Sequence, residues 1–213
     1  LQIIGKKPGV KKVAGMYLLL SDKGPLFFSD TTINFDPTVE DIVEITELTA
    51  KSVEQFNIKP RIALLSYSNF GSSDTAEAKM MAEATRIVKQ RNPSLIIDGE
   101  MQGMLAFNKE ILKENYPFSD LVDVDVNVLI FPNLTAGNIA YHLLKEIGGV
   151  DIIGPILLGL KKPVNVLQLG SGVRNIINMA TVAVVDAQLK TRVDTNLEVQ
   201  RVSWWKRMKK KNK

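Results

Sequence analysis

Residues 61–88 read RIALLSYSNFGSSDTAEAKMMAEATRIV. The first part, 62–67, is a short run of mostly apolar residues that is typical of a buried strand. The next part, 68–73, consists mainly of Ser, Asn and Gly and predicts a loop. Asp74 with Glu77 three positions later is a capping-box pattern that opens a helix. Apolar residues then recur on one helical face, at Met80, Met81, Ala84, Ile87 and Val88.

The same order of strand, polar loop and helix recurs along the chain. The pattern predicts further strands at 95–97, 126–131 and 164–167, loops at 98–100, 132–137 and 168–172, and helices at 101–114, 138–147 and 173–188. A hairpin is predicted from strands at 14–20 and 26–29, and Asp36-Pro37 is a helix start with Asp36 as the cap.

Strands that alternate with helices indicate an α/β fold, with a mainly parallel sheet flanked by helices. In such sheets the loops that leave the carboxyl ends of the strands lie at one edge, and ligands bind there. The polar loops of this chain are all strand-to-helix loops. We therefore expect them to converge.

Basic residues are concentrated at the end of the chain. The segment 201–213 holds seven Lys or Arg and no acidic residue, so removing it changes the net charge from +4 to −3. The rest of the chain therefore gives no indication of a nucleic-acid partner. Trp204 and Trp205 beside the lysines would suit a membrane surface or RNA. A solvated terminus is the simpler interpretation, and we expect neither partner.

The residue composition also indicates the cellular compartment in which the chain is expected. It has no cysteine, which excludes disulfides and thiolate metal sites and fits a cytoplasmic protein. No apolar run approaches the roughly 20 residues of a membrane-spanning helix. The start, Leu1-Gln2-Ile3-Ile4, has neither Met nor a signal-peptide pattern, so we expect a piece of a longer chain.

Two glycine-containing or hydroxyl-rich loops are candidates for binding anions. The loop 66–73 offers hydroxyls and free N–H groups at a helix N-terminus, which suits a phosphate, although it lacks the Lys of a P-loop. An ordinary capped helix start remains the alternative. Gly170-Ser171-Gly172 resembles the start of a dinucleotide fingerprint, but Asn175 stands at the third glycine position, which argues against nicotinamide binding here.

Few residues suit acid–base or metal chemistry. Asp98 and Glu100 could serve as acid and base or hold a metal, but such carboxylates more often cap helices or bind loop amides. His142 is the only histidine and lies beside Tyr141 inside a predicted helix, which favours a structural role. We expect no metal site in this chain.

Several stretches resemble the motifs of phosphotransacetylases, the phosphate acetyl- and butyryltransferases. Ser66–Ser73 is similar to their Ser-rich loop, and Asp98-Gly99-Glu100-Met101-Gln102 to their Asp-Gly-Glu/Pro-x-Gln motif. Residues 127–138, NVLIFPNLTAGN, resemble their Phe-Pro-Asp-Leu-x-x-Gly-Asn signature with Asn133 in place of Asp. Residues 154–160, GPILLGL, and 162–164, KPV, continue a resemblance that covers roughly residues 8–190.

The resemblance implies a fold of two α/β subdomains of the isocitrate/isopropylmalate dehydrogenase type, with the ligand in the cleft between them and two chains in a dimer. This chain would hold the second subdomain at 36–190. Residues 1–35 would be strands that lead in from the missing first subdomain, and 191–213 would be a basic tail. The helix at 173–188 is apolar over most of its circumference, so we expect a homo-oligomer or a fully internal helix.

Active members of that family commonly carry Ser-Arg-Gly after the Lys-Pro-Val strand and an Asp a few residues later. Here Gln168 and Leu169 replace the Ser and the Arg, and Asn175 replaces the Asp. Gln lacks the hydroxyl, Leu cannot bind phosphate, and Asn cannot take a proton near neutral pH. The resemblance therefore implies no catalytic residue in this chain.

The resemblance is nearest to the C-terminal phosphotransacetylase-like domain of bacterial NADP-dependent malic enzymes, which oxidatively decarboxylate malate to pyruvate. It implies a regulatory domain with acetyl-CoA as its effector and no cofactor of its own. NADP and a divalent metal would bind in the missing N-terminal malic enzyme domains. An active phosphate acetyltransferase or butyryltransferase is the alternative. The residues expected to bind acetyl-CoA are Ser66, Ser68, Asn69, Ser72, Asn133, Gly137 and Asn138.

Overall fold

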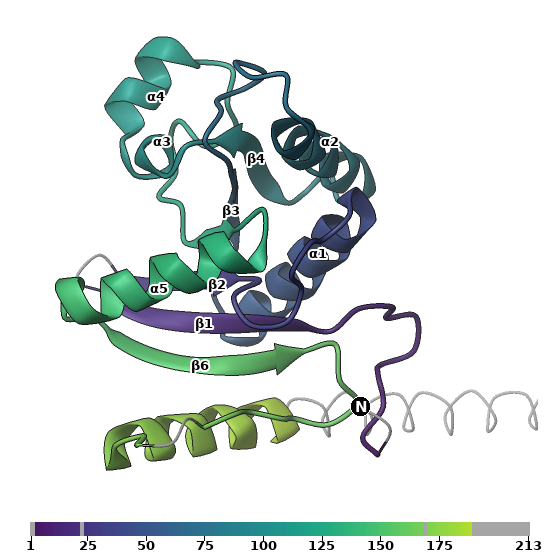
Figure 1. Cartoon of the computed structure of the whole chain (residues 1–213), viewed down its shortest axis with the longest axis vertical. Helices are drawn as coiled ribbons and strands as arrows, with labels where there is room; N and C mark the ends of the chain where they lie inside the picture. Colours follow the sequence, from purple (N-terminus) through teal and green to yellow (C-terminus); the bar gives the residue numbers. More distant parts are fainter. Residues whose placement is uncertain (1–2, 22–23, 168–169, 189–213) are drawn as a thin grey trace, which may run out of the picture.

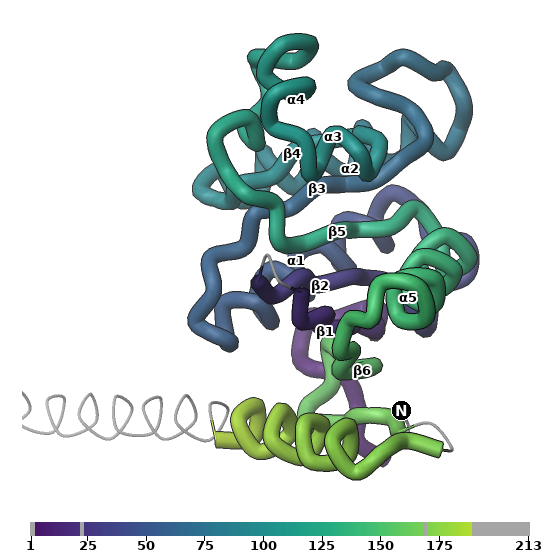
Figure 2. Tube along the Cα trace, turned by 90° about the vertical axis from the view of Figure 1, so that its left-hand side faces the viewer, coloured from purple at the N-terminus to yellow at the C-terminus, as the bar shows by residue number. Residues whose placement is uncertain are grey.

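Six strands form one sheet in the computed structural model, which describes residues 3–21, 24–167 and 170–188 (Figures 1 and 2). Their order across the sheet is β4-β3-β5-β2-β1-β6. The strands are β1 (Ala14–Ser21), β2 (Gly24–Ser29), β3 (Arg61–Leu65), β4 (Ile96–Met101), β5 (Val128–Ile130) and β6 (Asp151–Leu158). Neighbours from β4 to β2 are parallel, whereas β1 is antiparallel to both β2 and β6. The predicted α/β fold with a mainly parallel sheet is confirmed.

Helices cover both faces of this sheet. They are α1 (Val39–Gln55), α2 (Ala76–Arg91), α3 (Gly103–Phe107), α4 (Lys109–Asn115), α5 (Leu134–Gly148) and a helix over 173–188. One face packs against α1 and α2 and the other against α3, α4 and α5, while the 173–188 helix lies beside β6 (Figure 1). No helix within the described ranges has both the length and the apolar character needed to cross a membrane.

Alternation along the strands divides the core in two. Successive side chains of a strand point to opposite faces, and in β2 Phe27 faces α1 while Phe28 faces α5. Met16 and Tyr17 divide in the same way in β1. Because both faces are covered, these strands are apolar at consecutive positions instead of alternating with polar residues.

The helix caps differ from the predicted ones by one or two residues. Thr38, not Asp36, caps α1, and it forms a reciprocal capping box with Asp41. Thr75, not Asp74, caps α2 by accepting a hydrogen bond from the third residue of the helix. A threonine hydroxyl at the position next to the first helical residue reaches the free amides. The carboxylates of Asp36 and Asp74 are one or two positions too early.

Three predicted elements were wrong. Asp98, Gly99 and Glu100 are not a loop but the middle of β4. The helix predicted at 101–114 is two short helices, because the Asn108 side chain accepts a hydrogen bond from the amide of Ile111 and starts α4 anew. Residues 164–167 form no strand and contribute only one isolated bridge to β6.

Strand β6 was not predicted at all. Its sequence contains Gly154 and Pro155, and both residues normally argue against a strand. At the end of the sheet, however, β6 pairs only with β1 among the strands, so a missing proline N–H is tolerated. Gly154 is required there, because a Cβ atom would lie 2.4 Å from Cδ1 of Tyr17.

The central position of β2 makes the stability of the fold depend on Phe27, which is fully buried. We expect Phe27→Ala to lower the free energy of unfolding by about 3–5 kcal/mol, because it leaves a cavity in the core. Phe35→Ala is the matched control, since Phe35 is 73% exposed and its loss should cost less than about 0.5 kcal/mol. Urea denaturation measures both, and equal effects would contradict this account of the core.

Candidate functional site

The polar loops lie at one edge of the sheet. Strands β3, β4 and β5 run parallel, so the segments that follow Leu65, Met101 and Ile130 leave the same edge. The segment after β2 leaves there too, because β2 is parallel to β5. The expected convergence is confirmed for the loops after β3 and β5, whereas 98–100 is part of a strand and the segment 168–172 lies partly outside the described residues. The convergence places Ser66, Asn133 and the turn after Ser29 on a common side of the molecule.

A buried carboxylate holds the Ser-rich loop. Glu100 is 1% exposed, and its Oε1 accepts hydrogen bonds from the Ser68 hydroxyl at 3.0 Å and from the Gly71 amide at 2.7 Å. Its backbone carbonyl accepts a further bond from the Phe70 amide at 2.9 Å. Because a charged acceptor binds both a hydroxyl and an amide, Glu100 determines the shape of the loop.

The loop also satisfies many of its own donors. The Asn69 amide donates to the Ser72 hydroxyl at 2.9 Å, and the Ser68 amide donates to the Ser66 hydroxyl at 3.2 Å. The Asn69 side chain accepts from the Gln102 amide at 2.8 Å. In this arrangement Ser68 and the Asn69 amide are already engaged. The role of Ser66, Ser68, Asn69 and Ser72 in binding acetyl-CoA stays a prediction.

Asn133 links the start of α5 to α2. Its Oδ1 caps α5 by accepting from the Ala136 amide at 2.9 Å, and its Nδ2 donates to Glu77 in the first turn of α2 at 3.2 Å. The start of α5 is therefore in direct contact with the first turn of α2, the helix that follows the Ser-rich loop. Glu77 does not complete a capping box with Asp74 but reaches across to the next loop.

Gly137 and Asn138 lie inside α5 and not in a loop, because α5 begins at Leu134. The Gly137 amide donates within the helix to the Asn133 carbonyl at 3.3 Å, so it is not a free donor for a ligand. A Cβ atom at Gly137 would lie 2.7 Å from the Asp30 carbonyl oxygen, so its absence allows close packing of α5. Asn138 is half-buried, and its side chain has no hydrogen bond to a described residue.

Asp30 is a site residue that sequence reasoning missed. Its buried carboxylate accepts hydrogen bonds from the amides of Gly15 at 3.0 Å, Thr32 at 2.9 Å and Asn34 at 3.0 Å. These bonds fix the turn between β2 and α1 at the same edge of the sheet. An Asp directly after a strand, with backbone donors two and four residues later, is the pattern of an Asx turn and could have indicated it.

Aromatic rings line a small cavity beside α5. The rings of Tyr17 and Tyr141 stack at 4.1 Å with their hydroxyls 3.3 Å apart, and Tyr141 also bonds His142 Nε2 at 2.8 Å. Burial, together with the Tyr141 hydroxyl, raises the pKa of Tyr17 well above its usual value. The cavity has a volume of about 30 Å³. It is lined by Tyr17, Tyr141, Lys145, Ile152, Gly154, Leu167, Ser171, Asn175 and Met179.

Asp98 has structural partners. It pairs with Lys89 at 2.8 Å and accepts from the Asp120 amide at 3.0 Å, and Lys89 also pairs with Asp120 at 2.9 Å. Burial opposes the charge of Lys89, but hydrogen bonds to Asp98 and Asp120 outweigh it and raise the pKa of the lysine. Within the described ranges, no three acidic, His or Cys side chains are grouped so that they could hold a metal ion.

Known proteins are similar to this chain in sequence and in fold. The family model described as phosphate acetyl/butaryl transferase matches residues 1–184. The chain belongs to the phosphate acetyl/butyryl transferase family. Among its relatives, the NADP-dependent malic enzyme of Haemophilus influenzae is 47% identical over 186 residues, which cover 87% of this chain and 24% of that enzyme.

Transferases of the family are similar over the same region. The phosphate acetyltransferase of Bacillus subtilis is 37% identical over 88% of this chain and 58% of its own length. The structure of a phosphotransacetylase from Streptococcus pyogenes superposes with a TM-score of 0.82 at 39% identity, and the match covers 88% of this chain and 57% of that one. The chain thus spans about a quarter of the malic enzyme relative and just over half of the transferases.

The position at which active phosphate acetyl/butyryl transferases are expected to carry an Asp is on the wall of the aromatic cavity. Asn175 occupies it, near Tyr141 and Lys145. Gln168 and Leu169, the other two replaced positions, lie outside the described residues. Lys145 lies seven residues and Tyr141 three residues after Asn138, so all three share one face of α5. Asn138 lies on the same face of α5 as these two lining residues but does not itself line the cavity, whereas Asn133 contacts α2.

The Ser-rich loop should depend on the charge of Glu100. We expect Glu100→Gln to lower the free energy of unfolding by about 1–3 kcal/mol, because it weakens two charge-assisted hydrogen bonds in a buried site. Hydrogen exchange at the Gly71 amide should accelerate more than exchange in α1. Glu114→Gln is the control, since Glu114 is exposed on α4. Unchanged exchange at Gly71 would show that Glu100 does not hold the loop.

Proposed function

We propose that this chain is the acyl-CoA-binding regulatory domain of an NADP-dependent malic enzyme, with acetyl-CoA as its effector and without transferase chemistry of its own. The observation that carries the proposal is Asn175 on the cavity wall. An amide cannot accept a proton from a thiol near neutral pH, so the position expected to hold the family's base is inert. Binding does not require this proton transfer, and a binding site can persist without it.

Other groups around the cavity do not replace the base. The raised pKa of Tyr17 keeps its hydroxyl protonated near neutral pH, so it cannot take a proton from a thiol. His142 Nε2 is engaged with the Tyr141 hydroxyl, and His142 itself is exposed outside the cavity lining. The greater similarity to malic enzymes, at 47% against 37% for the Bacillus transferase, supports the same choice.

Acetyl-CoA would meet polar groups along α5. Asn138 offers a side-chain amide without a described partner, and Lys145 offers a cation two turns later. A thioester carbonyl or a phosphate of coenzyme A needs donors of these kinds. Ser66 and Asn69 would contribute from the neighbouring loop, with Asn133 linking the start of α5 to α2.

The remaining functions belong to the rest of the parent enzyme. Malate oxidation, NADP and a divalent metal would lie in the N-terminal malic enzyme domains, and the whole enzyme would work in the cytoplasm. An active phosphate acetyltransferase or butyryltransferase is the competing proposal, since the fold is shared with such enzymes.

The parent protein should respond to acetyl-CoA but should not make it. We expect calorimetric titration to show saturable binding, and Asn138→Ala to weaken it about 5- to 30-fold, because one neutral hydrogen bond is worth roughly 1–2 kcal/mol. Asn115→Ala is the matched control, since Asn115 is exposed on α4 and bonds only within its own helix. Acetyl-CoA should also change the rate of malate oxidation.

Acetyl transfer separates the two proposals. Acetyl phosphate and coenzyme A should give no acetyl-CoA with the full-length parent. Turnover at ordinary enzyme rates, on the order of 1–1000 per second, would establish the transferase instead. Absence of any acetyl-CoA effect on malate oxidation would end the regulatory proposal.

We also propose that the chain forms a homo-oligomer through its exposed apolar helices. Ile139, Leu143 and Ile147 recur at four-residue spacing on α5, and Ile147 is 82% exposed. The 173–188 helix adds further exposed apolar side chains, at Val173, Ile176, Ile177, Val184 and Val185. Met179 and Val182 of that helix are buried, so the helix is covered on one side only and is not fully internal. Contiguous apolar surface of this kind marks protein interfaces.

A charge on the α5 stripe should dissociate the oligomer. We expect Leu143→Glu to shift sedimentation velocity toward the monomer, because a carboxylate would be buried without a partner. Met104→Glu on α3 is the control, since Met104 is similarly exposed but lies away from the stripe. A wild type that stays monomeric at all concentrations would contradict the proposal.

A further inference from the structure

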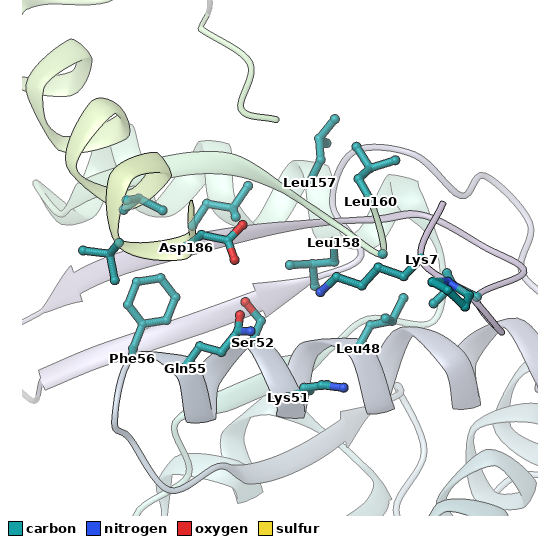
Figure 3. A pocket seen from close by; sticks show the side chains of 16 residues that line it. Lys7, Leu48, Lys51, Ser52, Gln55, Phe56, Leu157, Leu158, Leu160 and Asp186 are labelled. Atoms are coloured by element: carbon teal, nitrogen blue, oxygen red, sulfur yellow. The ribbon is translucent and has the colours of Figure 1, made fainter. Parts of the chain in front are cut away.

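A second cavity lies on the opposite face of the sheet from the tyrosines. It has a volume of about 120 Å³ and opens between α1, β6, the segment 7–10 and the 173–188 helix (Figure 3). Its walls are largely apolar, and they include Leu48, Phe56, Ile156, Leu158 and Val182. None of the proposed acetyl-CoA residues is in this lining, although residues 156–160 of it belong to the stretch 154–160 that shares the family resemblance.

Ser52 projects a free hydroxyl into this cavity. The residue is only 9% exposed, and its side chain makes no hydrogen bond to a described residue. Two other α1 hydroxyls behave differently, because Thr46 and Thr49 each donate to the carbonyl four residues earlier at 2.7 Å. The Ser52 hydroxyl is accessible from the cavity and is not committed to a described partner, so it can bond a molecule there.

Polar side chains beside Ser52 form one rim of the cavity. Lys51 precedes it and Gln55 follows one turn later on α1, and both line the cavity without a hydrogen bond or ion pair to a described residue. Lys7 and Asp186 also line it, but each has another interaction. Lys51 therefore supplies a cation that no described side chain neutralises.

We propose that this cavity binds a short-chain carboxylic acid, with its hydrocarbon end between Leu48, Leu158 and Val182 and its carboxylate at the rim. Ser52 and Gln55 would donate to the carboxylate, and Lys51 would neutralise it. An apolar cavity of about 150 Å³ holds one benzene molecule. A volume of about 120 Å³ therefore limits the hydrocarbon part to a short, branched chain or a small ring.

The site is separate from the proposed acetyl-CoA site. Leu48 and Ser52 belong to α1 and Phe56 caps its C-terminus, and α1 covers the other face of the sheet from Tyr141 and α5. The two cavities have no lining residue in common, but both include residues of β6 and of the 173–188 helix, which contributes Asn175 and Met179 to one and Val182 and Val185 to the other. The inference does not rest on the regulatory function, and it can hold whether or not the parent binds acetyl-CoA.

The test is to titrate the whole chain with 4-methylpentanoate and to monitor binding by NMR chemical shifts and by calorimetry. We expect saturable binding with a dissociation constant on the order of 1 mM, which is reasonable for a ligand of about eight non-hydrogen atoms. Shifts should be largest at Ser52, Leu158 and Val182. Ser52→Ala should weaken binding about fivefold, because it removes one hydrogen bond.

Two further variants test separately how the hydrocarbon part and the carboxylate of the ligand contribute to binding. Ser52→Leu should fill the cavity and abolish binding, while circular dichroism reports whether the variant remains folded. Lys51→Gln should weaken binding about threefold, as expected for a partly exposed charge pair. Lys113→Gln on α4 is the matched control and should change nothing. The uncharged analogue 4-methylpentan-1-ol should bind more weakly than the acid.

Several results would overturn the proposal. The first is no saturable binding at ligand concentrations up to roughly ten times the expected dissociation constant. The second is a folded Ser52→Leu variant that binds as tightly as the wild type. The third is a set of NMR chemical-shift changes centred on Tyr17 and Tyr141. Equal affinity for the acid and the alcohol would overturn the carboxylate assignment. Because acetyl-CoA binding is measured separately with Asn138→Ala, failure here is distinguishable from failure of the proposed regulatory function.

Discussion

Buried carboxylates at the carboxyl edge of the sheet are the constraint on which the functional surface depends. Glu100 at the end of β4 binds Ser68 and the Gly71 amide, and Asp30 after β2 binds the amides of Gly15 and Thr32. A carboxylate removed from water is tolerated only when such donors surround it. The loops must therefore close around Glu100 and Asp30. The strands determine the positions of Glu100 and Asp30, and the hydrogen bonds to these two carboxylates determine the conformations of the loops.

The sequence was sufficient to predict the fold class, because strands of a sheet that is covered on both faces are apolar at consecutive positions. Apolar runs such as 62–65 and 128–130 alternate with amphipathic helices, and that alternation predicts a parallel sheet. The pattern failed at β6, where Gly154 and Pro155 interrupt the apolar run for reasons that depend on Tyr17 and on the edge of the sheet. Neither reason is visible in local sequence, because both arise from contacts between distant segments.

The common edge of the polar loops was predictable from the sequence, but their hydrogen bonds were not. Small polar residues after β3 and β5 indicated that these loops leave one edge of the sheet, and Asn133 links the second of them to the first turn of α2 through Glu77. The residue types did not reveal which donors are free to bind a ligand. The Ser68 hydroxyl and the Gly71 amide, which the sequence suggested for a ligand, both donate to Glu100. Two aromatic residues on different elements, Tyr17 and Tyr141, likewise meet only in the folded chain.

The 173–188 helix contributes residues to the walls of both cavities. The helix places Asn175 beside Tyr141, where a carboxylate would be a proton acceptor and an amide is only a hydrogen-bonding group. If the proposed function is right, the amide at this position removes the proton transfer, while Gly154 and the stacked tyrosines still shape the cavity. About two to three turns of helix later, Val182 and Val185 line the cavity that Ser52 enters. A shift of this helix would alter both cavities at once, so a ligand in either one that favours one helix position would change affinity at the other.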